Sequence, residues 1–232
     1  MPVDVVVPAH NEQATIADVL GAIRGAPATG RIIVVADACD DNTVPIASQL
    51  ADVVVTLEAH DKGSAMAAGL AHVQTELVAF CDADLRGLRP EHIEALLTVP
   101  PLEGQVVANR GDAVTGDRVP SWVAKSWGNL PSISGERRLP TALARSVRLA
   151  GSGWRAETRI NVAVAEHHLP WRHILFAGVR NSTKLGRSPI QWFDEIARVI
   201  AISAAFAPEL VSYVRGAAVS APPSPEPGLG ST

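Results

Sequence analysis

Two aspartates one residue apart, Asp82 and Asp84, end the apolar run of residues 77–81. Carboxylates this close repel each other, and a divalent cation with oxygen ligands would remove the repulsion. Mg²⁺ and Mn²⁺ prefer such ligands and keep coordination positions for water and phosphate oxygens. The D-x-D triplet is a weak motif by itself, so its place at the end of a buried strand carries the prediction of a cation site.

Polar residues also follow other apolar runs, in the segments "HNE", "DACDDNT" and "HDKGSA". If these runs are parallel strands, their carboxyl ends meet at one edge of the sheet, where ligands bind. The pattern predicts a rim that gathers Asn11, Glu12, Asp37 and Lys62 with the two aspartates. The alternative is that each is a turn or helix-cap residue, since Asp, Asn and Ser favour those positions.

The elements that would position these residues alternate between strand and helix. Apolar runs occupy residues 3–9, 31–36, 52–57, 76–81 and 105–109, and helical patterns occupy residues 15–24, 42–50, 63–73 and 90–97. Continuous apolar runs are typical of strands covered on both faces, and the alternation implies right-handed crossovers. The sequence therefore predicts an α/β fold with a mostly parallel sheet.

Composition narrows the class of protein. The 232 residues are 47% hydrophobic, which is enough to form the core of one domain. The net charge is -4, and the sequence shows no cluster of basic residues of the kind that a nucleic-acid binder has. Cys39 and Cys81 adjoin apolar runs, so we expect reduced thiols and a cytoplasmic protein. The chain enters a strand within three residues, and no stretch reaches the ~18 apolar residues of a spanning helix. We therefore expect neither a signal peptide nor a transmembrane segment.

Four ordered segments carry a resemblance to a known family. They are "VVVPAHNEQATIADVL", "VVADACDDNT", "DKGSAMAAGL" and "LVAFCDADL", all within residues 3–85. They are similar to the corresponding segments of family 2 glycosyltransferases with the GT-A fold. The resemblance implies a nucleotide-binding α/β sandwich with a mostly parallel central sheet. It also implies transfer of a sugar from a UDP- or GDP-linked donor, with Mg²⁺ or Mn²⁺ as cofactor.

The resemblance assigns roles residue by residue. Asp84 and Asp82 match the carboxylates that meet the metal and the ribose. Asp37 matches the carboxylate that binds the base, and Lys62 matches a donor-contacting lysine. The other implied donor-binding residues are Pro8, Ala9, His10, Asn11, Glu12 and Ala83, with Lys184 and Arg187 as phosphate contacts in a later basic loop.

The second half resembles the family less closely. "SISGERRLPTALA", residues 132–144, is similar to the acceptor-side segment of glucosyl-3-phosphoglycerate synthases and their relatives, where a glycine-rich turn at a helix start holds an anionic acceptor. This implies acceptor contacts from Gly135, Glu136 and Arg137, with Arg138 as the alternative arginine. The simpler interpretation is that these arginines only solvate the surface at a helix end.

Two further residues are placed by the same resemblance. Glu157 falls at an acidic position that points into the cleft, which makes it the candidate acceptor-binding carboxylate or catalytic base. Some relatives place a histidine as third metal ligand near residues 174–187, and this chain has Arg180 and Asn181 there. Asn181 is therefore the candidate third ligand.

We expect one domain over residues 1–216. Its nucleotide-sugar-binding half spans residues 1–109 and its acceptor-binding half residues 110–189. Residues 190–216 predict an amphipathic helix, which is also a candidate surface for homodimer formation, and residues 217–232 predict a disordered tail.

The predicted function is metal-dependent transfer of a sugar to a small, anionic acceptor. One alternative is a lipid phosphate acceptor, with residues 190–216 at the membrane interface, although only Arg198 and Arg215 are basic there. Another is a nucleotide-sugar-binding protein without catalysis. A nucleotidyltransferase would show a Gly-rich loop after the first strand, where this chain has "PAHNEQAT".

Overall fold

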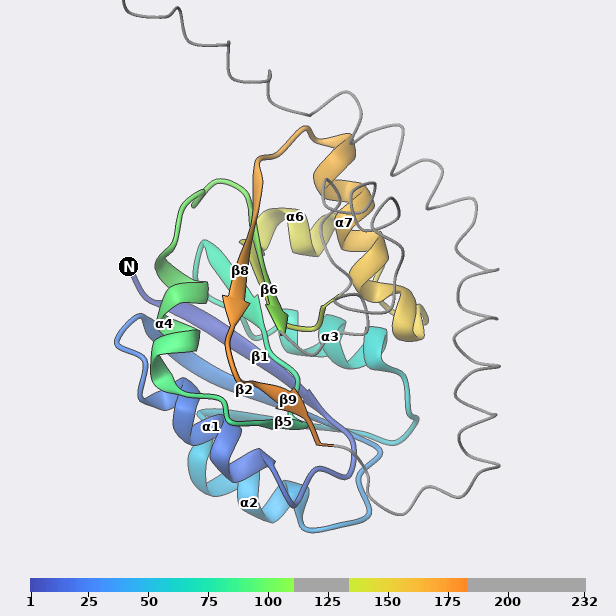
Figure 1. Ribbon diagram of the computed structural model, residues 1–232. Helices are drawn as coiled ribbons and strands as arrows, with labels where there is room; N and C mark the ends of the chain where they lie inside the picture. Colours follow the sequence, from blue (N-terminus) through green and yellow to red (C-terminus); the bar gives the residue numbers. More distant parts are fainter. Residues whose placement is uncertain (111–133, 183–232) are drawn as a thin grey trace, which may run out of the picture.

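The computed structural model describes residues 1–110 and 134–182, which form a mixed α/β fold (Figure 1). The strands are β1 (Val3–Ala9), β2 (Thr29–Asp37), β3 (Val53–Leu57), β4 (Leu77–Phe80), β5 (Leu85–Arg86), β6 (Gln105–Arg110), β7 (Arg137–Pro140), β8 (Trp171–Phe176) and β9 (Arg180–Asn181). The helices are α1 (Ile16–Arg24), α2 (Thr43–Leu50), α3 (Lys62–Leu70), α4 (Pro90–Thr98), α6 (Thr141–Ser146), the short 3₁₀ helix η1 (Gly153–Arg155) and α7 (Ala156–Glu166).

The seven-stranded sheet has the order β3-β2-β1-β4-β7-β6-β8, and β5 pairs with β9 in a separate two-stranded sheet. Neighbouring strands are parallel except where β7 runs antiparallel between β4 and β6. The predicted α/β class with a mostly parallel sheet is confirmed. Because β2, β1 and β4 are adjacent and parallel, their carboxyl ends lie along one edge of the sheet, as expected.

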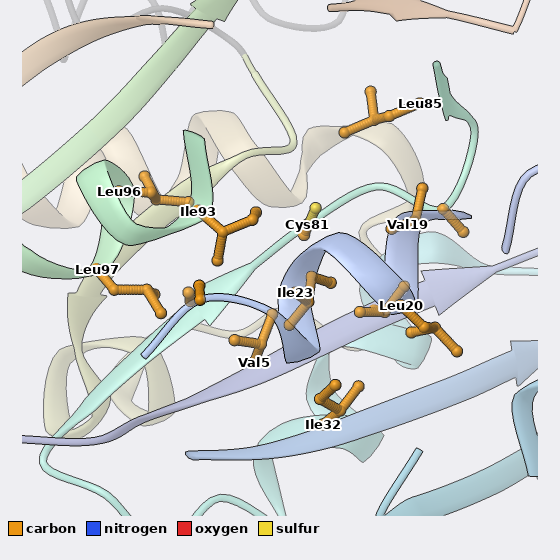
Figure 2. Close-up of a cluster of buried hydrophobic side chains, with 14 of the residues drawn as sticks. Val5, Val19, Leu20, Ile23, Ile32, Cys81, Leu85, Ile93, Leu96 and Leu97 are labelled. Carbon is orange, nitrogen blue, oxygen red and sulfur yellow. The ribbon is translucent and has the colours of Figure 1, made fainter. Parts of the chain in front are cut away.

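Two hydrophobic layers cover the sheet. Side chains of α1 and α4 pack on one face around Val5, Ile32 and Cys81 (Figure 2). Side chains of α3, α6 and α7 pack on the other face around Val6 and Ile33. Consecutive strand residues point to opposite faces, so the unbroken apolar runs in the sequence serve both layers.

The helices follow from local patterns. Helix α1 buries Ile16, Val19, Leu20 and Ile23, which share one face at helical spacing. Helix α3 is capped by Asp61, whose carboxylate accepts from the Ser64 N–H at 2.6 Å. The sequence predicted that α3 would reach residue 73. The helix instead ends at residue 70, because the next N–H groups bond three residues back and tighten the chain into turns.

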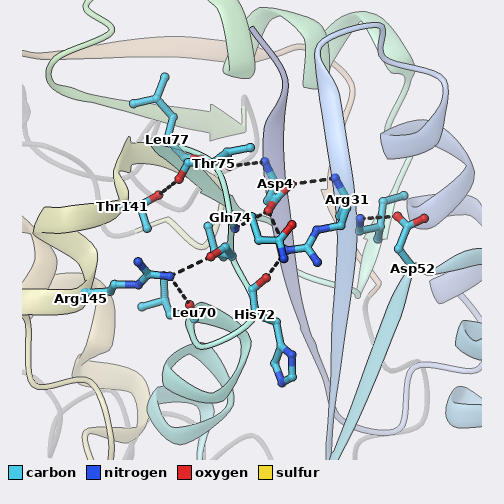
Figure 3. Close-up of polar contacts among 12 residues, drawn as sticks. Asp4, Arg31, Asp52, Leu70, His72, Gln74, Thr75, Leu77, Thr141 and Arg145 are labelled. Atoms are coloured by element: carbon cyan, nitrogen blue, oxygen red, sulfur yellow. Dashed lines mark hydrogen bonds and ion pairs between the residues drawn. The ribbon is translucent and has the colours of Figure 1, made fainter.

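A buried carboxylate ties the chain together at the opposite, amino-terminal end of β1. Asp4, which is 2% exposed, accepts from the N–H groups of Arg31 at 2.9 Å and Gln74 at 2.7 Å, and pairs with the Arg31 guanidinium at 3.2 Å (Figure 3). The same guanidinium also donates to the His72 carbonyl oxygen. The cluster therefore joins β1, β2 and the segment before β4.

Replacing Asp4 with alanine should lower the free energy of unfolding by about 2–3 kcal/mol, because two partly buried N–H groups and a guanidinium lose their buried acceptor. Urea denaturation measures the loss. Asp18→Ala, which removes an exposed carboxylate on α1, is the matched control and should cost less than about 1 kcal/mol. Equal losses in the two variants would contradict a structural role for the Asp4 cluster.

Candidate active site

The ends of β1 and β2 contact each other at the predicted rim. The His10 ring donates from Nδ1 to the Asp37 carbonyl oxygen at 2.6 Å, and the Cys39 thiol donates to the Ala9 carbonyl oxygen at 3.2 Å. Asn11 and Ala38 both have positive φ, 57° and 52°, so each strand turns sharply at its end. The turns bring the two polar segments together and keep the rim compact.

The neighbouring donor-side residues have mixed environments. The Glu12 N–H donates to Thr43 Oγ1 at 2.8 Å, which anchors the rim to the start of α2. Pro8 is half-buried, whereas Ala9 and Ala83 are 2% exposed and belong to the hydrophobic core. Cys39 and Cys81 are thiols, as predicted, and burial raises the pKa of the Cys39 thiol. The polar side chains of the rim are therefore adjacent to buried apolar residues of the core.

Lys62 joins two carboxylates from opposite sides of the site. Its Nζ lies 2.8 Å from Asp82 Oδ1 and 2.7 Å from Glu157 Oε1. Burial lowers the pKa of Lys62, but the two carboxylates outweigh burial and raise it above its ordinary value. The lysine is therefore a fixed positive charge between the end of β4 and the first turn of α7.

Glu157 is a buried member of this ion pair, with a side chain that is 5% exposed. Its Oε1 contacts Lys62, while its Oε2 has no hydrogen-bond partner among the residues that the structure describes. A buried carboxylate oxygen in this position can accept a hydrogen bond from a ligand hydroxyl. The sequence placed Glu157 in the cleft, and the structure places it beside the Lys62 ammonium.

Asp84 faces a different partner. The Asn181 side-chain amide donates from Nδ2 to Asp84 Oδ2 at 3.1 Å, and the Ser182 N–H donates to the Asp84 carbonyl oxygen at 2.6 Å. Leu85 pairs with Asn181 in the two-stranded sheet, and this pairing holds the two segments together. The structure therefore brings the D-x-D segment and the candidate third ligand into direct contact.

The donor set at this point fits a hard divalent cation. Asp82, Asp84 and Asn181 offer carboxylate and amide oxygens, which Mg²⁺ and Mn²⁺ prefer over nitrogen and sulfur. Within residues 1–110 and 134–182, no three His, Cys, Asp or Glu side chains are grouped so as to hold a metal ion. A cation held by Asp82 and Asp84 would therefore need further ligands of another kind, as the Asn181 amide oxygen, water or phosphate would supply.

The predicted acceptor segment has a different local structure from the one expected. Gly135 does not begin a helix, which was the sequence-based expectation. Residues 137–140 form β7 between β4 and β6, and the next helix, α6, begins at Thr141. The strand forms despite its charged residues because its backbone pairs with β4 and β6. The arginine side chains donate hydrogen bonds to carbonyl oxygens, which satisfies their buried N–H groups.

The two arginines of β7 point to opposite faces of the sheet, and both are 0% exposed. Arg137 donates from Nη1 to the Glu157 carbonyl oxygen at 3.1 Å and from Nε to the Ser134 carbonyl oxygen at 3.0 Å. Arg138 donates to the carbonyl oxygens of Leu97, Val99 and Pro101, and burial lowers its pKa to about 10. The interpretation of these residues as surface-solvating arginines is wrong, because neither guanidinium is exposed.

Gly135 and Glu136 precede the strand. Glu136 is fully buried and accepts from Ser134 Oγ at 2.7 Å. Gly135 lies so close to the Asp82 carboxylate that a Cβ atom at this position would overlap both carboxylate oxygens. Gly135, which belongs to the segment that resembles an acceptor site, therefore lies directly against Asp82, which resembles a donor-binding residue.

Gly135→Ala should weaken binding of a nucleoside diphosphate about 10- to 100-fold, because the added methyl must displace Asp82 from Lys62, and it should cost about 1–3 kcal/mol of stability. Calorimetry and urea denaturation measure the two effects. Gly21→Ala on α1 is the control, since its Cβ meets nothing within 4 Å and should not weaken binding. Unchanged nucleotide affinity in the Gly135 variant would contradict this placement.

Sequence reasoning gave no role to two residues at the start of α3. His60 Nδ1 lies 2.8 Å from Asp37 Oδ2, and its ring centroid is 4.0 Å from that of His10. Asp61 accepts from the N–H groups of Gly151 and Gly153, which fastens η1 to α3. Burial raises the pKa of Asp61, but these bonds and those from Ser64 outweigh it and lower the pKa. The sequence signal that could have identified His60 and Asp61 is their position directly before Lys62.

Some predicted features lie outside the described residues. They are Lys184, Arg187, the helix of residues 190–216 with its candidate dimer surface, and the tail of residues 217–232. Within the two described ranges, no helix combines the length and apolar character that crossing a membrane requires.

Comparisons with known proteins agree with this geometry. The model of the family described as "Glycosyl transferase family 2" matches residues 4–140. A 4,4'-diaponeurosporenoate glycosyltransferase of Staphylococcus aureus (strain MRSA252) is 30% identical over 107 residues, which cover 44% of this chain and 28% of that protein. The chain thus aligns with little more than a quarter of the length of this relative.

Solved structures share the fold. Glucosyl-3-phosphoglycerate synthase from Mycobacterium tuberculosis, in complex with Mn²⁺, UDP and glucosyl-3-phosphoglycerate, superimposes with a TM-score of 0.70 at 22% identity, covering 92% of this chain and 80% of that one. Mannosyl-3-phosphoglycerate synthase from Rubrobacter xylanophilus gives a TM-score of 0.65 at 20% identity, covering 90% and 75%. The family match extends over more than half of the sequence, and the rim lies in the matched part. The chain belongs to glycosyl transferase family 2.

Proposed function

We propose that the chain is a metal-dependent glycosyltransferase that moves a sugar from a nucleoside diphosphate donor to a small anionic acceptor. The observation that carries the proposal is the position of Lys62, whose Nζ contacts Asp82 at 2.8 Å and Glu157 at 2.7 Å. Asp82 belongs to the rim where a donor diphosphate would lie, and Glu157 belongs to the segment beyond it. One ammonium group thereby fixes the distance between the two halves of the site.

The residues of the site divide the chemistry between them. Glu157 Oε2 is the oxygen available to accept a hydroxyl proton or to orient a sugar hydroxyl. Asp84, with Asp82 and Asn181 beside it, would hold Mn²⁺ or Mg²⁺. When bound, such a cation neutralises the negative charge that develops on the nucleoside diphosphate leaving group. Lys62 keeps Asp82 and Glu157 in place before a ligand arrives.

The segment before β7 supports the proposal of an anionic acceptor. Gly135 lies in a bend, without a side chain, against Asp82. Backbone N–H groups outside a helix can also bind a carboxylate or phosphate. Arg137 supports this bend through the Ser134 carbonyl oxygen and supports α7 through the Glu157 carbonyl oxygen. Its buried guanidinium thus assists the acceptor site by positioning. The structural neighbour bound to phosphoglyceric acid and UDP-glucose with Mn²⁺ is consistent with a phosphorylated hydroxy acid.

A lipid acceptor is the second candidate function. The Staphylococcus aureus relative is named for 4,4'-diaponeurosporenoate. The helix of residues 190–216, which would contact a membrane in this case, lies outside the described residues.

A thermal-shift screen tests the proposal. UDP, GDP and their sugar conjugates are added with and without Mn²⁺, and phosphorylated hydroxy acids, neutral alcohols and anionic lipid micelles are then added to the stabilised complex. A ligand that binds only the native state raises its stability by RT ln(1 + [L]/Kd). We expect Mn²⁺-dependent stabilisation by UDP or GDP and a further increase with phosphorylated hydroxy acids. No stabilisation by any nucleotide would contradict the proposal, and a response to micelles alone would favour the lipid acceptor.

A further inference from the structure

The carboxylate expected to read the nucleobase is covered in the structure. The Asp37 side chain is 3% exposed. Its Oδ1 accepts from the Asp61 N–H at 2.9 Å, and its Oδ2 lies 2.8 Å from His60 Nδ1. Both oxygens are therefore engaged within the protein, and the group that stands between this carboxylate and solvent is the His60 ring, whose side chain is 47% exposed.

These contacts determine which ring nitrogens carry hydrogen. The carboxylate of Asp37 accepts, so His60 Nδ1 is a donor. The Asp37 carbonyl oxygen accepts from His10 Nδ1 at 2.6 Å, so His10 Nδ1 is a donor as well. In a neutral imidazole the other nitrogen, Nε2, then has a free lone pair and acts as an acceptor. The two rings share the same tautomer because each donates to a different oxygen atom of Asp37.

The two imidazoles also form one surface. Their centroids are 4.0 Å apart with an interplanar angle of 35°, so each ring covers part of the other and limits its rotation. His10 follows β1, and His60 lies two residues before Lys62, across the N-cap of α3. A donor whose diphosphate lies near Lys62 and Asp82 can therefore place its base at the histidine pair.

We propose that His60, held by Asp37 and packed against His10, selects the nucleobase of the donor by presenting Nε2 as a hydrogen-bond acceptor. The bases that fit are those with an imino N–H on the edge that pairs, which are uracil and guanine. Cytosine and adenine present a ring-nitrogen acceptor at the corresponding position and are disfavoured. Asp37 is a positioning residue that sets the tautomer of His60. The inference rests on the proposed function, because it assumes a nucleoside diphosphate donor.

Calorimetry of the full chain at pH 8, above the ordinary titration range of histidine, tests the proposal. UDP, GDP, CDP and ADP are each titrated with Mn²⁺ present, and pyrophosphate serves as a probe without a base. The wild-type chain should bind UDP or GDP about tenfold more tightly than CDP and ADP, which is the effect of roughly one hydrogen bond. His60→Ala should remove this preference and leave pyrophosphate affinity unchanged. His72→Ala, which removes an exposed histidine after α3, should behave as the wild type.

The outcomes separate this inference from the proposed function. If no nucleotide binds to the wild-type chain, the proposed function fails. If UDP or GDP is preferred but His60→Ala keeps the preference, or loses pyrophosphate affinity equally, the inference about His60 is overturned. A preference for CDP or ADP, or none, overturns it too.

The positioning role of Asp37 has a separate readout. ¹⁵N NMR of the histidine rings should show the Nδ1–H tautomer for His60 in the wild type and a mixture of tautomers in Asp37→Asn, with a smaller base preference. If the preference falls while the His60 tautomer is unchanged, Asp37 contacts the base directly and the positioning role is wrong.

Discussion

Replacing Asp84 with alanine should abolish the Mn²⁺ dependence of nucleotide binding while the fold stays intact. Asp82 already forms an ion pair with Lys62 at 2.8 Å, and we therefore assign the larger share of cation binding to Asp84. The loss of a carboxylate ligand should lower nucleoside diphosphate affinity in Mn²⁺ by about 100-fold or more. Half-buried Asp84 lies at the rim, so its removal opens no cavity in the core.

Calorimetric titration of the nucleoside diphosphate, with and without Mn²⁺, measures the effect of Asp84→Ala. Asp82→Asn should weaken binding less, because Lys62 and Glu157 remain in contact. Urea denaturation should give Asp84→Ala a free energy of unfolding close to that of the wild type. Equal Mn²⁺ dependence in the variant and the wild type would remove the metal role from Asp84.

Replacing Lys62 with methionine should produce the largest loss of stability, about 3–4 kcal/mol. The lysine side chain is 11% exposed, and without its charge Asp82 and Glu157 are left as neighbouring carboxylates with little solvent. Burial lowers the pKa of Lys62, but these carboxylates outweigh burial and raise it, so Lys62 stays charged as the pH rises through neutrality. Urea denaturation at pH 7 measures the loss, and sugar transfer should be abolished in the same variant.

A double variant separates the structural effect of Lys62 from its effect on the reaction. Adding Glu157→Gln to Lys62→Met removes one of the two repelling charges and should restore about half of the lost stability. Activity should stay absent, since two residues of the proposed site are altered. Loss of activity without loss of stability in the single variant would mean that the ion pair contributes nothing to the fold.

The strands that carry the rim were predictable from the sequence because both of their faces are covered. The unbroken apolar runs of β1, β2 and β4 are typical of strands that are buried on both faces, as these are. The four family-like motifs, in their order, identified the polar residues that follow these strands. The contacts of Asp82 with Lys62 and of Asp84 with Asn181 needed tertiary geometry, but the residues themselves were identified beforehand.

Strand β7 was missed for a physical reason. Two consecutive arginines after a glycine predict an exposed turn, because a charged side chain is rarely buried without partners. Here Arg137 and Arg138 are buried, since carbonyl oxygens of Ser134, Glu157, the last turn of α4 and the segment after it accept from their guanidinium groups. Apart from Ser134, these partners come from distant parts of the chain and leave no local pattern. His60 escaped notice similarly, because only the fold brings it onto Asp37.

The central claim is that the rim built from β1, β2 and β4, joined to Glu157 through Lys62, catalyses sugar transfer. Mass spectrometry of the product tests it most directly, with the purified chain, Mn²⁺, UDP- or GDP-linked sugars and a phosphorylated hydroxy acid. We expect a glycosylated acid that appears with stoichiometric release of nucleoside diphosphate, requires Mn²⁺ and is absent with Glu157→Gln. Tight, Mn²⁺-dependent donor binding without any transferred sugar would contradict the claim and identify the chain as a nucleotide-sugar-binding protein.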